Sequence, residues 1–347
     1  MIGLACGTYA FLHARLGAIK AELLTDRHWE QLVAAGSFAE QRPVLESTAY
    51  AKHLAGTPEA ALRNIQGALH RPARKIERSV PALTGRFIRV WERRDLLRNL
   101  KTILKGKALG RSAEDIRSEL LDLDPAHLLP VEALLRCSSL EAALDLLEAT
   151  ELRHWIKEAR RIYERDPTLF GLDAALDRLY YPELCRQLEQ LDRSDRAAIE
   201  PLVNSEIDQV NLLWLLRYRL NYRLSPAETY YLLVPVTGRI GVERLKAAVR
   251  EESLEAIAAR IAQEPYRRLV ARCQTIWQVE VALRRFRADQ ARASLRRAVF
   301  TLGEALALLV LKGIEIRDLV AVLEGTRLGA TRHDILEQLA SPAMGRE

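Results

Sequence analysis

Apolar residues recur three and four positions apart along most of the chain, and this spacing puts side chains on one face of an α-helix. Near the start the pattern predicts a helix with the apolar face Tyr9, Leu12, Leu16, Ile19 and Leu23. Strand signals are scarce. The best candidate, residues 230–236, contains Pro235 and precedes Gly238, so it is predicted to be a helix end and a loop. The pattern therefore predicts an all-α protein.

Three longer stretches carry the same periodicity and predict long helices. The first begins near residues 84–85 and is expected to end at Gly106 and Gly110. The second runs from about residue 197 to residue 224, and the third from about residue 271 to residue 295.

The first two long helices share a polar signature that is followed by a matching break. The signature reads Glu92-x-x-Asp95-x-x-x-Asn99-Leu100 in the first helix and Glu206-x-Asp208-x-x-Asn211-Leu212 in the second. Residues 111–114 and 225–228 follow, and both segments are typical of a helix N-cap with an acidic residue in the first turn. A pattern repeated at this distance predicts a repeated structural unit.

A third, degraded copy of the signature is predicted at residues 278–283, where the asparagine is missing, with its break at residues 311–315. Three copies divide the chain into three related helical units. The predicted units are residues 1–110, 111–225 and 226–347.

These residues resemble a known family, the C subunit of archaeal and bacterial V/A-type rotary ATPases, whose counterpart in eukaryotic V-ATPases is the d subunit. The resemblance covers almost the whole chain. It rests on Tyr9, Arg15 and Leu23-Leu24 near the start, on the run from Arg94 to Lys101 with Leu104-Lys105-Gly106-Lys107, and on Glu206, Asp208 and Asn211. The lost asparagine of the third copy departs from the family pattern.

The resemblance implies a fold and a function. It implies three similar helical subdomains in a pseudo-threefold arrangement that forms a funnel. It also implies a non-catalytic rotor subunit on the cytoplasmic face of the membrane, held there peripherally through the membrane rotor ring. The foot of the central shaft would enter the funnel, and the subunit would transmit torque between shaft and ring for ion transport. No cofactor and no metal are expected.

Composition agrees with a helical protein and excludes several other classes. The 347 residues include only 17 Gly and 13 Pro, and 49% are hydrophobic and 28% charged. These values exclude disordered and collagen-like chains and argue against a turn-rich all-β fold. The length alone allows two or three domains. The longest apolar run, residues 305–311, is far shorter than the ~20 residues that cross a bilayer.

The polar signature residues have two interpretations. They could contact the shaft or the ring, or they could tie neighbouring helices together within each unit, because buried amides need hydrogen-bond partners. The second interpretation is favoured, since a residue repeated in successive units serves the packing of the repeat.

The net charge of +6 is partly concentrated on two helix faces. These faces are formed by Arg74, Lys75 and Arg78 and by Arg285, Arg292 and Arg296. They could dock an acidic shaft end or lipid headgroups, although a solvated face with ion pairs is the favoured interpretation. Nucleic-acid binding is not expected, because aromatic residues are not interleaved with the arginines.

Motifs for catalysis are missing from the sequence. It contains no GxxxxGK[ST], HExxH or GxSxG motif, so no catalytic residue is predicted. Cys6, Cys137, Cys185 and Cys273 form no CxxC pair and are expected to be buried thiols in a reducing compartment. Two alternatives to the rotor subunit stay open: a helical scaffold or adaptor unrelated to rotary ATPases, and an all-α enzyme with a dispersed active site.

Overall fold

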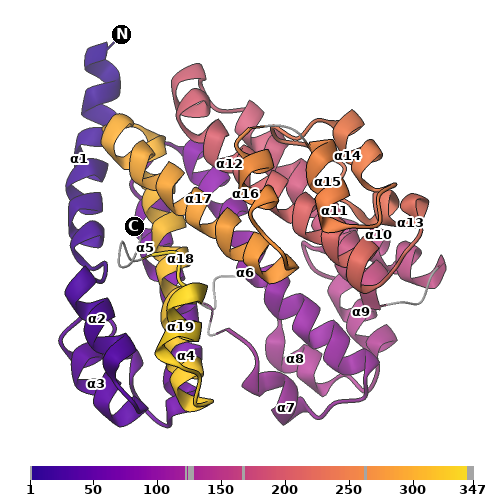
Figure 1. Ribbon diagram of the computed structural model, residues 1–347, viewed down its shortest axis with the longest axis horizontal. Helices are drawn as coiled ribbons and strands as arrows, with labels where there is room; N and C mark the ends of the chain where they lie inside the picture. The colour runs from indigo at the N-terminus through magenta and orange to yellow at the C-terminus, as the bar shows by residue number, and fades with distance from the viewer. Residues whose placement is uncertain (1, 122, 124–128, 166–168, 262–263, 342–347) are drawn as a thin grey trace.

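The computed structural model describes residues 2–121, 123, 129–165, 169–261 and 264–341, without the side chains of residues 2–8, 70, 165 and 170. Across these ranges the chain folds into helices joined by short loops, with no strand (Figure 1). The predicted all-α class is therefore confirmed. The loop predicted around Pro235 is also found, since the preceding helix ends at Leu232.

The helices differ widely in length, and the three longest lie far apart in the sequence. The α-helices are α1 Ile2–Ala21, α2 Asp26–Ala34, α3 Phe38–Glu46, α4 Pro58–Gln66, α5 His70–Glu77, α6 Ala82–Ala108, α7 Ala113–Ser118, α8 Val131–Arg136, α9 Leu140–Glu148, α10 Arg153–Arg165, α11 Leu169–Glu189, α12 Arg193–Leu216, α13 Pro226–Leu232, α14 Val242–Ala248, α15 Leu254–Ile261, α16 Tyr266–Ala271, α17 Ile276–Arg297, α18 Leu302–Arg327 and α19 Arg332–Gln338. Two 3₁₀-helices, η1 Ala51–His53 and η2 Gly67–Leu69, and a π-helix, η3 Arg217–Asn221, complete the description.

The first long helix, α6, does not end at Gly106 as predicted. Gly106 is buried inside the helix, and a Cβ there would overlap the side chain of Ile116 in α7. The glycine is therefore needed for close packing and not for a turn. The helix ends after Ala108, and Gly110 follows with a φ of 65°, a conformation that terminates helices.

The break predicted at residues 311–315 is also wrong, because this segment lies inside the continuous helix α18. Lys312 and Glu315 face the interior and form a buried ion pair at 2.7 Å. The hydroxyl of Tyr50 donates to Glu315 at 2.8 Å. The polar residues that suggested a break thus join α18 to the N-terminal helices.

Each of the three long helices α6, α12 and α18 uses one buried polar side chain to hold the segment that follows it. Asn99 accepts from the backbone N–H of Leu121 at 2.8 Å and donates to its carbonyl at 2.9 Å. Asn211 accepts from Val234 N–H at 2.9 Å and donates to the carbonyl of Val236 at 2.9 Å.

Asp318 makes the equivalent contact in α18 and accepts from Ala340 N–H at 2.8 Å. The sequence separation from the polar residue to its backbone partner is 22 residues for both Asn99 and Asp318. The third copy of the signature is therefore centred on Asp318, and the prediction at residues 278–283 is wrong.

The three copies end alike, with a residue of positive φ and then a capped short helix. Gly110, Arg223 and Gly329 have φ values of 65°, 54° and 73°. Ser112, Ser225 and Thr331 follow and cap α7, α13 and α19 with their side chains, so the two predicted N-caps are confirmed. The π-helix η3 accommodates one extra residue in the second copy, which places Arg223 one position later than the two glycines.

The N-terminal helices pack on the C-terminal part of the chain. Helix α18 contacts α1, α2, α3, α4, α5 and α19, and Figure 1 shows these elements side by side. Helix α6 contacts α5, α7, α9 and α11, while α12 contacts η3, α11, α17 and α18. The unit boundaries 1–110, 111–225 and 226–347 stay predictions.

Replacement of Asn99 by Ala should lower the free energy of unfolding by about 2–4 kcal/mol, because the N–H and C=O of buried Leu121 lose their partner. Asn99→Asp should also destabilise the protein, since a carboxylate cannot donate to the Leu121 carbonyl. Urea denaturation followed by circular dichroism measures both. The control is Arg86→Ala on the exposed side of the same helix, expected within about 0.5 kcal/mol of wild type.

Gly106→Ala should destabilise the protein by about 1–3 kcal/mol through overlap with Ile116. Gly17→Ala is the matched control, because no atom lies within 4 Å of a Cβ at that helical position, and it should stabilise by about 0.5–1 kcal/mol. Thermal unfolding compares the two. The double variant Gly106→Ala/Ile116→Ala should lose less unfolding free energy than the two single variants lose together, because removing the Ile116 side chain makes room for the new methyl group. Strictly additive losses would contradict the packing explanation.

Candidate functional site: a charged cleft between the long helices

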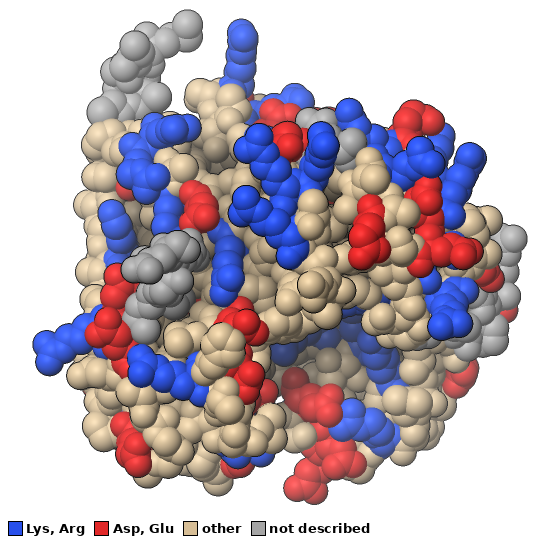
Figure 2. Space-filling model, viewed as in Figure 1, with Lys and Arg blue, Asp and Glu red and all other residues tan. Residues whose placement is uncertain are grey.

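A row of cations follows one face of α6 and lines a cleft of about 320 Å³. The row consists of Arg94, Arg98, Lys101 and Lys105, which are spaced by four, three and four residues and therefore share a helix face. Helix α11 and Trp214 of α12 form the opposite wall. Figure 2 shows the molecule hollowed below α17, with Lys and Arg at the floor of the hollow.

Helix α11 supplies acidic partners for the far end of this row. Lys101 pairs with Asp177 at 2.6 Å, and Lys105 pairs with Asp173. Burial raises the pKa of Asp177, although Lys101 acts in the opposite direction. Arg98 is exposed, and within the described residues its guanidinium forms no ion pair and reaches the amide oxygen of Gln66 at 3.5 Å. The row therefore keeps a free positive charge toward the cleft.

Glu206 of α12 lies between two arginines from other helices. Arg94 donates to its carboxylate at 3.1 Å, and Arg287 of α17 forms a second ion pair with it. Burial acts to raise the pKa of Glu206, but Arg287 and Arg94 outweigh this effect and the pKa lies below its ordinary value. The residue thus stays ionised and joins α6, α12 and α17.

The network continues from α17 to α18 and η3. Glu280 pairs with Arg217 at 2.7 Å and with Arg317 at 3.4 Å. Arg284 pairs with buried Asp318 at 3.3 Å. Ion pairs that cross several helices resist sliding of one helix against another, because each displacement would separate buried charges.

The signature residues are mostly packing residues in the structure. The hydroxyl of buried Tyr9 donates to Asp195, joining α1 to α12. Arg15 donates to Ser79 Oγ at 2.7 Å and to the carbonyl of Lys75 at 3.3 Å.

The remaining signature residues divide between packing and the cleft. Asp208 accepts from the backbone N–H groups of Gly238, Arg239 and Ile240 at 2.7–3.2 Å. Asn99 and Asn211 hold the backbone segments described above. Asp95 is half-buried next to Arg94. Burial acts to lower the pKa of Arg94, but Glu206 and, to a smaller extent, Asp95 raise it above its ordinary value. Glu206 is the signature residue that joins the ionic network.

The two predicted basic faces differ in their surroundings. Arg74 pairs with Glu77 at 3.3 Å, whereas Lys75 and Arg78 are exposed. Arg285 donates to the carbonyls of residues 337 and 339 at 2.9 Å, and Arg292 donates to the carbonyl of residue 341. These two arginines therefore hold the C-terminal segment against α17. Arg296 is exposed.

The cysteines are less buried than predicted. Cys137, Cys185 and Cys273 are half-buried free thiols, and burial raises the pKa of Cys185 to about 11. The side chain of Cys6 lies outside the described residues. Within the described part of the chain, no group of three His, Cys, Asp or Glu residues is placed to hold a metal ion.

The sequence did not identify Arg287, Arg317 and Asp318 as members of the ionic network, and it placed Glu280 only in the predicted third copy of the signature. The four-residue row on α6 could have been found from its helical spacing, because three of its members lie in the run that carries the family resemblance. The partners on α17 and α18 carry no such signal.

Comparison with known proteins identifies the family. The family model described as ATP synthase (C/AC39) subunit matches residues 12–338. The C subunit of the A-type ATP synthase of Methanocaldococcus jannaschii is 24% identical over 331 residues, covering 91% of this chain and 82% of the relative. The corresponding A-type ATP synthase protein of Pyrococcus abyssi is 22% identical over 351 residues, covering 96% of this chain and 91% of the relative.

None of the helices in the described ranges has the length and apolar character to cross a membrane. The residues that the family model matches include the whole of α6, α12 and α18. They therefore also include the ionic network that joins these helices. The protein belongs to the ATP synthase (C/AC39) subunit family.

Proposed function

We propose that the chain is a non-catalytic central-stalk subunit of a V/A-type ATP synthase or ATPase, in which it links the central shaft to the membrane rotor ring. The foot of the shaft docks against the charged cleft, and three helical subdomains surround it as a funnel. The subunit lies on the cytoplasmic face of the membrane and turns with the ring. The observation that carries this proposal is the family match over residues 12–338.

Two structural features support a role in transmitting torque. The ion pairs of Glu206 and Glu280 join α6, α12, α17, α18 and η3. In addition, the polar residue of each long helix fixes the backbone segment that follows the next short helix. A body cross-linked in this way deforms little when a load is applied to one side. The low number of glycines and prolines agrees with this stiffness.

The charge of the cleft favours an acidic partner. Arg94, Arg98, Lys101 and Lys105 face two aspartates of α11, so cations are in excess along this wall. A complementary acidic surface would be steered into the cleft and held in register by these charges. The alternative of a helical scaffold unrelated to rotary ATPases has no support from the comparisons.

Replacement of Arg98 by Glu should weaken association with the central shaft subunits by roughly tenfold to a hundredfold, because it puts a negative charge where the acidic partner binds. Native mass spectrometry or pull-down with purified shaft subunits and ring measures the association. The control is Arg153→Glu at the exposed start of α10, which should leave it unchanged. A wild-type chain that binds neither the shaft nor the ring would overturn the proposal itself.

A further inference from the structure

The three long helices begin at the same end of the molecule, and α1 joins them there. Tyr9 of α1 bonds to Asp195 in the first turn of α12, and Asp195 accepts from the N–H of Leu302, the first residue of α18, at 3.2 Å. Thr84 in the first turn of α6 also hydrogen-bonds in this group. Toward the upper edge of Figure 1, α1 lies beside the turn from α17 to α18.

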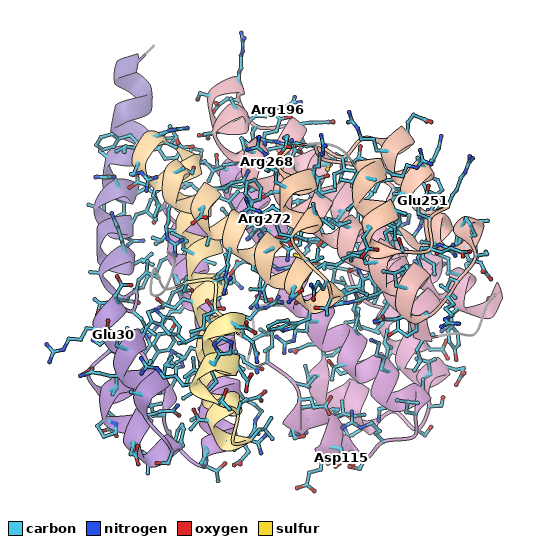
Figure 3. The ribbon with its side chains drawn as sticks, in the orientation of Figure 1. Glu30, Asp115, Arg196, Glu251, Arg268 and Arg272 are labelled. Atoms are coloured by element: carbon cyan, nitrogen blue, oxygen red, sulfur yellow. The ribbon has the colours of Figure 1, made fainter. Side chains whose placement is uncertain are left out.

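This end carries exposed arginines that form no ion pair among the described residues. Arg78 follows α5, Arg86 lies near the start of α6, and Arg193 and Arg196 lie in the first turn of α12. Arg296 and Arg297 end α17. We call these six residues the basic end. Arg196 is labelled near the upper edge of Figure 3.

Two of these arginines occupy positions at which a positive charge destabilises the helix. The N-terminus of a helix carries partial positive charge, so cations in its first turn are unfavourable for the helix. Arg193 and Arg196 occupy that turn of α12. Their positive charge adds to that of the neighbouring helix N-termini, and the sum favours binding of anions.

Four carboxylates at this end each make a contact with a group outside the basic end. Glu304 pairs with His13 at 2.9 Å, and Glu77 pairs with Arg74 and Arg89. Asp195 is buried, and Asp192 caps α12. The six arginines of the basic end outnumber these carboxylates and the half-buried Glu200 of α12, so the surface keeps an excess of positive charge.

Large apolar side chains are exposed among the arginines. Phe11 of α1 is 61% exposed, Leu83 of α6 is 49% exposed, and Val299 and Phe300 of the turn after α17 are 40% and 37% exposed. Phe300 has a φ of 58°, which is rare for a bulky residue. The ring of His13 lies 4.5 Å from the Phe300 ring and helps to hold it in this position.

From this combination we infer that the basic end binds the headgroup region of an anionic phospholipid membrane. Arginines pair with the phosphates, and the four apolar side chains enter the boundary between headgroups and acyl chains. A purely charged acidic surface would match the arginines but would leave the four apolar side chains in water, whereas the headgroup region accommodates both kinds of side chain, and for this reason the membrane is favoured. The inference rests on the proposed function, which brings the subunit to the membrane.

Vesicle flotation with the purified full-length chain tests the inference. We expect binding to vesicles of phosphatidylglycerol and phosphatidylcholine, weakened by salt, and little binding to phosphatidylcholine alone. The double variant Arg193→Gln/Arg196→Gln should bind the anionic vesicles roughly thirtyfold more weakly. Phe11→Ser should also weaken binding and should reduce its persistence at high salt.

The matched control is Arg244→Gln/Arg250→Gln, which removes the same charge from exposed positions in and after α14 and should leave vesicle binding unchanged. Equal weakening by the control would reduce the effect to net charge and overturn the inference. Equal binding to both kinds of vesicle would also overturn the inference. The same holds if the wild-type chain binds no vesicles and the Arg193→Gln/Arg196→Gln variant loses association with the purified ring.

A separate measurement distinguishes failure of this inference from failure of the proposed function. The Arg193→Gln/Arg196→Gln variant should still associate with the shaft subunits as wild type does, because neither residue lines the charged cleft. Loss of vesicle binding with retained shaft association supports both proposals. Vesicle binding without any shaft association would contradict the proposed function alone, and shaft association without vesicle binding of the wild-type chain would contradict the membrane inference alone.

Discussion

The bond between one buried polar side chain and a distant piece of backbone organises each third of this fold. Asn99, Asn211 and Asp318 lie in the C-terminal halves of long helices and fix the backbone segment that follows the next short helix. A short helix of six or seven residues is marginal on its own, so its position depends on contacts at both of its ends. The polar side chain provides one of these contacts, and the serine or threonine cap provides the other.

The sequence was most informative where this bond is made by asparagine. Asn99 and Asn211 stand in similar surroundings, and their repetition predicted two related units. Asp318 makes the equivalent contact by accepting hydrogen bonds from two backbone N–H groups. However, it lies in α18, which is buried on nearly every side. A helix that is buried all round has no polar face to set a period, so neither its extent nor its central aspartate could be identified from the pattern.

The charged cleft was harder to predict than the fold. Glu206 was identified as a signature residue, but its partners Arg94 and Arg287 lie 112 and 81 positions away, and only tertiary structure brings them together. Arg285 and Arg292 recur at helical spacing with Arg296, and this pattern is typical of a solvated charged face. Their partners are backbone carbonyl groups near the C-terminus. Every residue has such a group, so the sequence cannot indicate which carbonyl an arginine will bind.

The packing of the N-terminal helices on α18 has a consequence for synthesis of the chain. Leu24 and His13 each bond to a residue 291 positions later, and Tyr50 bonds to one 265 positions later. During translation the first five helices therefore emerge long before the helix that buries them. The part of their apolar surface that packs on α18 stays exposed until the ribosome has made nearly the entire polypeptide, and exposed apolar surface of this kind is prone to aggregation during synthesis.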